Sequence, residues 1–245
     1  MNAWLSPPPH LHLPIRRVDF WRVSLQRTAV ETRRFWHILS AAEQERAAKF
    51  YFEKDRQAFV VGRGMLRLLL GRYLALDPRA VAFEYGEFGK PTLGSATELQ
   101  FNVSHSQGKM LLGFCWETAV GVDIEQIRTY QAMSDIAHRY FSAVEYAQFL
   151  TVSPEQVPEA FFNCWTRKEA YIKAIGEGLS CPLDEFDVSL LPGEPARLIR
   201  IRGSEAAAAA WTLFSFTPFA GYRGAAVIAG RDWQPAFYDG DAFAG

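Results

Sequence analysis

Three carboxylates and one lysine, in two short segments, are the side chains best suited to chemistry. The first segment is 121–125, GVDIE. Because alternate side chains of a strand lie on one face, a strand here would project Asp123 and Glu125 together. Val122 and Ile124 would enter the core on the opposite face. Two carboxylates at this spacing suit Mg²⁺, which takes one or two of them, keeps waters and binds substrate phosphates; an ordinary half-exposed strand has the same pattern.

The second segment is 165–173, WTRKEAYIK, within a helix predicted at 158–175. At about 100° per residue, Glu169 and Lys173 lie on one stripe of that helix. Spaced i, i+4 in the favourable order, the pair is also typical of a surface salt bridge worth roughly 0.2–0.5 kcal/mol. Taken alone, this helix indicates no more than an ion pair.

Two polar segments could bind phosphate. In 101–106, FNVSHS, a strand runs into turn-forming residues and leaves Ser104 and His105 at a sheet edge, where hydroxyl, imidazole and N–H groups can hold an anion. A catalytic Ser-His arrangement is not supported, because adjacent strand residues point to opposite faces and no Gly-x-Ser-x-Gly turn is present. In 86–91, GEFGKP, a turn places Lys90 on a loop, where a lysine is usually solvated.

The charges are unevenly distributed along the chain. The net charge is −1, from 26 Lys and Arg and 27 Asp and Glu. Residues 15–72 contain 13 of the basic and 6 of the acidic residues, so they carry +7 and the remainder carries −8. Such a split can place a phosphate-attracting region beside a metal-attracting one, although two unevenly solvated surfaces would give the same numbers.

Composition and length restrict the class of protein. Of 245 residues, 49% are hydrophobic and 22% charged, which excludes a disordered or collagen-like chain and suffices for one or two globular domains. No apolar run approaches the ~20 residues that cross a bilayer, and residues 1–14 lack the pattern of a signal peptide. Three scattered cysteines are too few for a disulfide scaffold. We therefore expect a soluble, cytoplasmic protein.

Apolar periodicity and turn signals predict the elements that position these residues. Helices are predicted at roughly 41–58, 59–75, 131–140, 143–150 and 158–175. Strands are predicted at 80–85, 99–103, 109–116, 119–125, 185–190, 196–202, 210–217 and 223–229. Ser142 and Glu145 match a capping box. Helices followed by strands, twice over, argue for an α+β fold whose two similar halves meet near residue 120.

Four segments describe the domain organisation. We interpret 1–14 as a flexible N-terminal extension, 15–119 as a basic N-terminal half, 120–231 as a C-terminal half and 232–245 as a loose tail. The C-terminal half carries both carboxylate segments.

In this order, the motifs resemble those of the 4′-phosphopantetheinyl transferases, specifically the larger, monomeric, surfactin-synthetase-activating (Sfp-type) class. The matching pieces are GKP at 89–91, FNVSHS at 101–106, GVDIE at 121–125 and WTRKEAYIKAIGEGL at 165–179, with a looser match at 45–67. The likeness spans roughly residues 38–230 in register.

The resemblance implies two pseudo-symmetric α+β halves with coenzyme A bound in the cleft between them. It implies that 4′-phosphopantetheine passes from coenzyme A to a serine of an apo carrier protein of the acyl, polyketide or peptidyl type. Adenosine 3′,5′-bisphosphate would be released. The partners are then coenzyme A and the carrier, with no nucleic acid and no membrane, and the chain would act as a monomer.

The family motifs also assign roles to residues. Asp123, Glu125 and Glu169 would hold Mg²⁺, with Mn²⁺ as the alternative ion. The residues that would bind coenzyme A are Arg46, Lys90, Ser104, His105, Asp123 and Lys173. Arg46 is the candidate for the adenosine 3′-phosphate. Phe59 and Glu43 stand where some relatives have polar or basic contacts, so this chain departs from the family there.

For the mechanism, we add a hypothesis of our own to the resemblance. Glu169, directly or through water, would accept the proton of the carrier serine, and Lys173 would neutralise or protonate the departing phosphate oxygen. The carrier would dock near Gly176–Leu183, where Leu179 and Leu183 offer an apolar surface; the alternative is that both leucines cap the core.

Two other functions are compatible with parts of the sequence. A metal-dependent phosphodiesterase or nuclease would also use separated carboxylates, but no interleaved aromatic and basic pattern of RNA binding is present. A non-catalytic carrier-binding module would be expected to have lost a metal ligand or Lys173, and all of these are retained.

Overall fold

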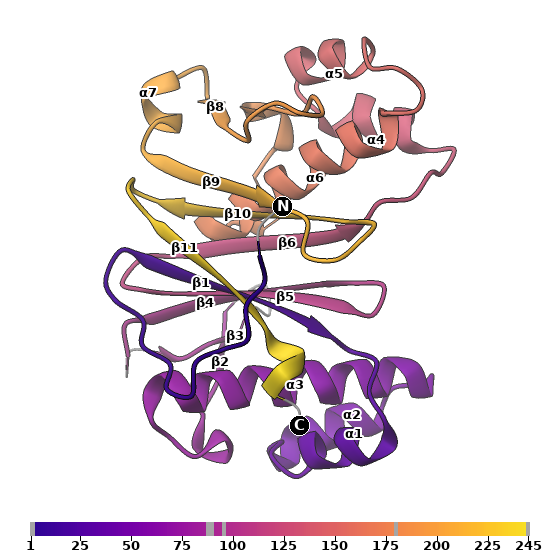
Figure 1. Cartoon of the computed structure of the whole chain (residues 1–245). Coiled ribbons are helices and arrows are strands. Elements are labelled where there is room, and N and C mark those ends of the chain that lie inside the picture. Colours follow the sequence, from indigo (N-terminus) through magenta and orange to yellow (C-terminus); the bar gives the residue numbers. More distant parts are fainter. Residues whose placement is uncertain (1–2, 87–90, 95–96, 179–180, 244–245) are drawn as a thin grey trace.

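The computed structural model describes residues 3–86, 91–94, 97–178 and 181–243. Its helices and strands form four layers, with two sheets face to face in the middle and helices on both outer sides (Figure 1). The fold is α+β, as the sequence predicts.

The first sheet has the strand order β11-β1-β5-β4. Its strands are β1 (Arg17–Ser24), β4 (Leu99–Ser106), β5 (Lys109–Trp116) and β11 (Gln234–Asp239). The helices on its outer side are α1 (Ala29–Trp36), α2 (Ala41–Ala48) and α3 (Glu53–Leu74). A short hairpin of β2 (Glu84–Tyr85) and β3 (Pro91–Thr92) precedes β4.

The second sheet has the strand order β6-β10-β9. Its strands are β6 (Val120–Gln126), β9 (Trp211–Phe216) and β10 (Tyr222–Ala229). The helices on its outer side are α4 (Met133–Tyr140), α5 (Ala143–Phe149) and α6 (Val157–Ile175), of which α6 packs on β6 and β10. The remaining elements are β7 (Phe186–Val188), β8 (Leu198–Ile201) and α7 (Glu205–Ala208).

The two halves repeat one order of strands. In the first sheet β1 pairs with β5 and β5 with β4; in the second β6 pairs with β10 and β10 with β9, all antiparallel. In each half the first strand precedes the helices, and two strands follow them. The second of these two strands, β5 or β10, lies between the other two in the sheet. This shared topology is the pseudo-symmetry that the resemblance implies.

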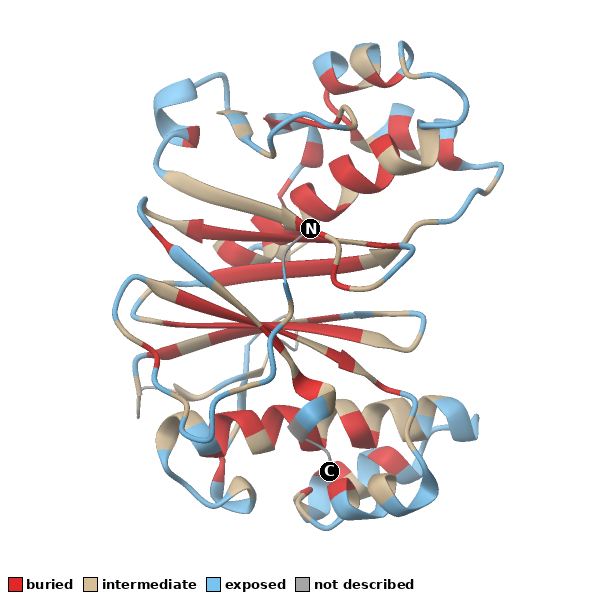
Figure 2. Ribbon diagram, in the orientation of Figure 1, coloured by how far each residue is buried: buried red, intermediate tan, exposed pale blue. Residues whose placement is uncertain are grey.

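Among the described residues, three apolar cores hold the layers together. Figure 2 shows buried residues along the strands of both sheets and along α3 and α6. One core lies between the first sheet and α1–α3, one lies under α4–α6, and the third lies between the sheets. Phe20 and Leu111 of the first sheet meet Val122, Ile124 and Ile228 of the second there, and all five are fully buried. The prediction that Val122 and Ile124 enter the core is confirmed.

Local signals account for most helix boundaries. The capping box predicted at Ser142 and Glu145 starts α5. Gly64 is tolerated inside α3 because a Cβ there would lie 2.7 Å from Phe35, so the glycine lets α1 approach closely. The break before α3 lies at 49–52 rather than at the predicted 58–59. Apolar residues continue at helical spacing across positions 58 and 59, so the helix does not end there. No helix in the described part of the chain is both long and apolar enough to span a membrane.

Both chain ends are more ordered than the sequence indicates. Residues 234–239, expected in a loose tail, form β11, which pairs in parallel with β1 and covers that edge of the sheet. In the N-terminal segment, expected to be flexible, Leu5 bridges to Tyr238 of β11. Trp4 contacts Phe237 edge to face, with ring centroids 5.2 Å apart. The N-terminal and C-terminal segments therefore pack against each other, through pairs of residues that are far apart in sequence.

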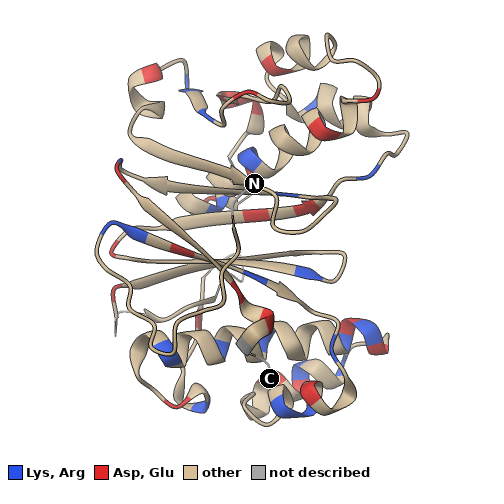
Figure 3. Cartoon of the chain, viewed as in Figure 1, with Lys and Arg blue, Asp and Glu red and all other residues tan. Residues whose placement is uncertain are grey.

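Part of the basic excess of the N-terminal half is neutralised inside the fold. Figure 3 shows acidic and basic residues interspersed over α1–α3. Arg22 and Arg27 bind Asp239 and Asp241 from the C-terminal segment, at 2.7 and 2.5 Å. Because such arginines stabilise the structure, the phosphate-attracting region is smaller than the charge count indicates.

Candidate active site

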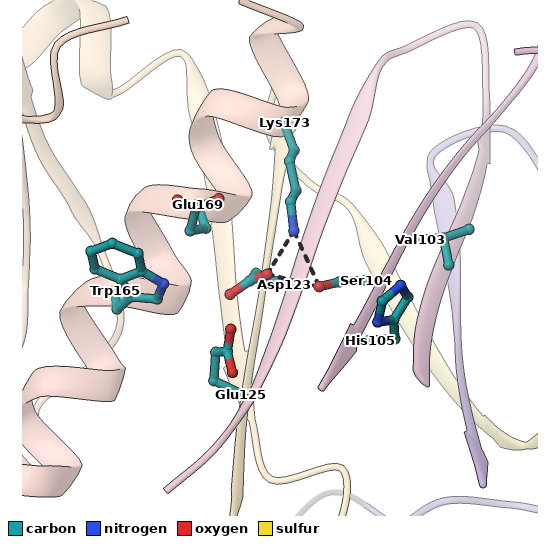
Figure 4. Close-up of a pocket in the computed structure, with 8 residues that line it drawn as sticks. All are labelled: Val103, Ser104, His105, Asp123, Glu125, Trp165, Glu169 and Lys173. Carbon is teal, nitrogen blue, oxygen red and sulfur yellow. Dashed lines mark hydrogen bonds and ion pairs between the residues drawn. The ribbon is translucent and has the colours of Figure 1, made fainter. Parts of the chain in front are cut away.

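A pocket lies where the two halves meet, between β4 of the first sheet and β6 and α6 of the second (Figure 4). The side chains that line it are Val103, Ser104, His105, Asp123, Glu125, Trp165, Glu169 and Lys173. Six of these eight residues belong to the site that the sequence predicts. Strands β4 and β6 are both edge strands, so their polar side chains are open to the junction between the two halves.

Gly121 sets the distance between β6 and α6. A Cβ at this position would overlap the carbonyl oxygen of Ala170 and the backbone nitrogen of Ala174. The helix can therefore lie directly on the strand only because residue 121 has no side chain. This close approach brings Glu169 and Lys173 of α6 over the carboxylates of β6.

Asp123 is the most buried of the three carboxylates, with 3% of its surface exposed. Lys173 Nζ donates to Oδ1 at 2.6 Å, and Ser104 Oγ donates to the same oxygen at 2.8 Å. Lys173 also donates to Ser104 Oγ, at 3.1 Å. Among the described residues, nothing hydrogen-bonds the buried Oδ2 of Asp123. An unpaired buried carboxylate oxygen is costly, so Oδ2 is suited to a ligand that the chain itself does not supply.

Glu125 lies two residues further along the same face of β6. Ser106 Oγ, from β4, donates to its Oε2 at 2.6 Å. Burial raises the pKa of Glu125 above its usual value; the Ser106 hydrogen bond opposes this rise, and the charge of Asp123 adds to it. The carboxylate is thus held in place by a hydroxyl from the other half of the molecule.

Glu169 completes the acidic cluster from the helix side (Figure 4). Burial raises its pKa from 4.5 to about 7, and the negative charges of Asp123 and Glu125 contribute to the rise while Lys173 opposes it. A carboxyl group that titrates near neutral pH can both accept and release a proton.

The donor set of the pocket fits a divalent cation. As the side chains stand, no three Asp, Glu, His or Cys residues in the described ranges lie close enough together to hold a metal ion, and Lys173 neutralises Asp123 instead. The unpaired Oδ2 of Asp123 and the raised pKa values of Glu125 and Glu169 nevertheless indicate that the three carboxylates lack a partner that a cation could supply. A cation between these carboxylates would relieve their mutual repulsion and their desolvation.

The remaining predicted contacts lie in different places. His105 is exposed and lines the pocket beside Ser104. Arg46 is exposed on α2, with its guanidinium 5.3 Å from the ring centre of Phe59, and it does not line this pocket. Lys90 lies outside the described residues.

Of the two leucines expected to form an apolar docking surface after α6, one is buried. Helix α6 ends at Gly176, which has a left-handed backbone with φ of 77°. Leu183 is 7% exposed and belongs to the core under α6, so it caps that core. Leu179 lies outside the described residues.

Two residues at the site, and a third that anchors α6, are not among those that the sequence predicts. Ser106 could have been found, because a strand period of two places it on the face of Ser104. Trp165 lines the pocket as well, while its ring stacks on that of Phe161. Lys168 is fully buried and pairs with Glu145 at 2.8 Å, which anchors the middle of α6; only the tertiary structure shows this partner.

Comparison with known proteins identifies the family. Residues 119–229 match the family described as "4′-phosphopantetheinyl transferase superfamily", and residues 21–113 match "4′-phosphopantetheinyl transferase, N-terminal". The 4′-phosphopantetheinyl transferase HetI of Nostoc sp. is 37% identical over 240 residues, which cover 97% of this chain and 98% of HetI. This chain belongs to the 4′-phosphopantetheinyl transferase superfamily. The resemblance seen in the motifs is therefore confirmed.

Other phosphopantetheinyl transferases match shorter stretches. Sfp of Bacillus subtilis is 33% identical over 160 residues, 65% of this chain and 70% of Sfp. Among solved structures, the Chronobacterium ammoniagenes ACPS–CoA complex covers 46% of this chain and 98% of its own, at 19% identity and a TM-score of 0.35. The two family matches fall on either side of the turn between β5 and β6, one on each half of this phosphopantetheinyl transferase.

Proposed function

We propose that this phosphopantetheinyl transferase moves 4′-phosphopantetheine from coenzyme A to a serine of an apo carrier protein. Adenosine 3′,5′-bisphosphate is the second product. The observation that carries the proposal is the convergence of the predicted carboxylates, lysine, serine and histidine in one pocket between the halves of a chain of this family.

Asp123, Glu125 and Glu169 would hold Mg²⁺, or Mn²⁺ in its place. A divalent ion bound there would screen the pyrophosphate charge against the incoming nucleophile. The unpaired Oδ2 of Asp123 supports this role, because it is a buried ligand atom that no described side chain uses.

The phosphates of coenzyme A would bind on the β4 side of the pocket. Ser104 and His105 supply a hydroxyl and an imidazole there, and Lys173 would exchange its bond to Asp123 for a phosphate oxygen. Arg46 and Lys90 remain our candidates for further phosphate contacts outside this pocket. This division places the basic groups mainly on the N-terminal half, 15–119, and the carboxylates on 120–231.

Glu169 would take the proton of the attacking serine. Its pKa near 7 suits a base that works at neutral pH. The serine oxygen bonds to the phosphorus that bears pantetheine, and the departing bisphosphate keeps the electron pair of the broken P–O bond. Lys173, one turn along α6, neutralises the charge that develops on that leaving oxygen.

The carrier would approach over Gly176–Leu183, next to the end of α6 that carries Lys173. Leu183 does not take part in that surface, since it is buried. Both sides of the pocket come from one chain, so we propose a monomer as the active form. The described cysteines are all free and buried, which fits a reducing compartment, the cytoplasm.

The test is incubation with coenzyme A, Mg²⁺ and a panel of apo carrier proteins, followed by intact-mass spectrometry of each carrier. We expect one phosphopantetheine group on at least one carrier, and none when Asp123→Asn replaces the wild type. No mass gain on any carrier would overturn the proposal. Cleavage of coenzyme A without an acceptor would instead support a phosphodiesterase.

A further inference from the structure

Arg223 is the cross-strand neighbour of Glu125. Strands β6 and β10 pair antiparallel, with Arg223 directly opposite Glu125 and Ala225 opposite Asp123. Directly opposed residues share one face of a sheet, with Cβ atoms about 4.5–5.5 Å apart. An arginine in this position is within reach of the carboxylate, and Arg–carboxylate pairs readily engage both oxygens.

The guanidinium of Arg223 is held by a different carboxylate. Its Nη2 donates to Glu159 Oε1 at 2.5 Å, and Nη1 contacts Thr217 Oγ1 at 3.4 Å. Glu159 lies in the first turn of α6, where the helix dipole favours a negative charge. The Arg223 side chain is 17% exposed, so its charge has little water to compensate the loss of that partner.

Glu125 is meanwhile held by a neutral group. Its side-chain hydrogen bond comes from Ser106, a hydroxyl, and the cations that act on its pKa are Lys173 and Arg128. A hydroxyl leaves the negative charge of Glu125 available, whereas a paired guanidinium would neutralise it.

We propose that Glu159 is a positioning residue that holds Arg223 away from Glu125 and so keeps that carboxylate available to the metal ion. The inference rests on the proposed role of Glu125 as a metal ligand. Without Glu159, Arg223 turns across the strand pair to Glu125 and competes with the cation for its oxygens.

The test measures Mn²⁺ binding to the full chain without coenzyme A, from the electron paramagnetic resonance signal of free Mn²⁺. The variants are E159Q, R223Q, the double variant E159Q/R223Q and E125Q. The matched control is E185Q, which breaks the Glu185–Arg202 pair of 2.8 Å away from the pocket. The unfolding temperature of each variant is measured alongside.

We expect E159Q to weaken Mn²⁺ binding about tenfold, as is typical when a group that orients a metal ligand is lost. R223Q and E159Q/R223Q should bind at least as tightly as the wild type, because the competing cation is gone. A merely structural ion pair predicts the opposite, with the double variant as weak as E159Q.

The outcomes separate this inference from the proposed function. If E125Q weakens Mn²⁺ binding and E159Q does not, the metal site stands and the role of Glu159 is wrong. A double variant as weak as E159Q also overturns that role. If E125Q binds Mn²⁺ as the wild type does, Glu125 is no metal ligand and the inference falls with that part of the proposed function.

Discussion

The ammonium of Lys173 lies 2.6 Å from Oδ1 of Asp123, across the contact between α6 and β6. The sequence alone was compatible with a lysine paired to Glu169 on an exposed helix surface. The structure instead places Lys173 in a pocket, against a carboxylate that is 3% exposed. An ammonium in this position compensates the buried charge, and under the proposed function a cation or a phosphate would rearrange the pair.

Lys173→Ala should therefore change the binding of metal and of coenzyme A in opposite directions. Coenzyme A affinity should fall roughly tenfold or more, because a charged hydrogen bond to phosphate contributes about 1.5–3 kcal/mol. Mn²⁺ affinity without coenzyme A should rise, since Asp123 Oδ1 loses the ammonium that neutralises it and keeps only the bond from Ser104. Isothermal titration calorimetry measures both. Lys109→Ala, whose ammonium bonds Ser24 at 3.1 Å, is the control; two unchanged affinities would leave Lys173 as an ion pair only.

Glu169→Gln should lower the rate of phosphopantetheine transfer by about 10²–10⁴-fold at saturating Mg²⁺ and coenzyme A, because a general base contributes that much. The fold should persist, as the side chain is only partly buried and glutamine keeps its shape. Rates come from holo-carrier formation, and circular dichroism checks folding. Glu205→Gln, an exposed carboxylate in α7, should retain full activity. A Glu169→Gln enzyme with nearly the wild-type rate would remove the assignment of the base.

The raised pKa of Glu169 predicts how the stability of the metal-free protein depends on pH. Its pKa is about 7 in the folded protein against 4.5 as the usual value, so between these values the folded state holds a proton that the unfolded chain has released. The contribution of this group is fully present below pH 4.5 and is lost as pH rises through about 7.

In a chelator, the wild type should therefore lose about 2 kcal/mol of unfolding free energy relative to Glu169→Gln between pH 5 and pH 8. Urea unfolding at both pH values measures the difference. Excess Mg²⁺ should abolish the loss, because a cation compensates the ionised carboxylates. A difference that stays constant with pH would show that Glu169 ionises normally.

The sequence predicted the features that local patterns determine. The alternation in GVDIE correctly separates Val122 and Ile124 from Asp123 and Glu125, since one strand determines both faces. The capping box of α5 and the alignment of Glu169 with Lys173 along α6 are likewise determined by residues close together in the sequence. Features that depend on the meeting of the two halves, such as the bond from Ser106 to Glu125, have no signal within either segment alone.

Strand β1 illustrates why other parts of the fold were not predicted. Asp19 interrupts its apolar pattern and would argue against a buried strand, yet it is 1% exposed. Arg17 Nε donates to it at 2.7 Å and Tyr73 Oη at 2.8 Å, so one partner comes from the same strand and the other from α3. The parallel partner β11 lies more than two hundred residues away. Neither the bond from α3 nor the pairing with β11 can be inferred from residues near β1.

Gly121→Ala tests whether the contact between α6 and β6 builds the site. The new methyl group would overlap the backbone of Ala170 and Ala174, which cannot move as a flexible side chain would, so α6 must shift away from the strand. We expect a loss of about 1–3 kcal/mol in unfolding free energy, the usual effect of overpacking.

The same shift should separate Glu169 and Lys173 from Asp123, so transfer activity and Mn²⁺ affinity should fall more than the loss of stability explains. The matched control is Gly62→Ala in α3, where the nearest atom to the new methyl is Met110 Sδ at 3.4 Å. That substitution should leave activity unchanged and raise stability by up to about 1 kcal/mol, because alanine favours a helix. If Gly121→Ala lowers stability yet keeps wild-type Mn²⁺ affinity, the approach of α6 to β6 supports the fold without setting the geometry of the carboxylates.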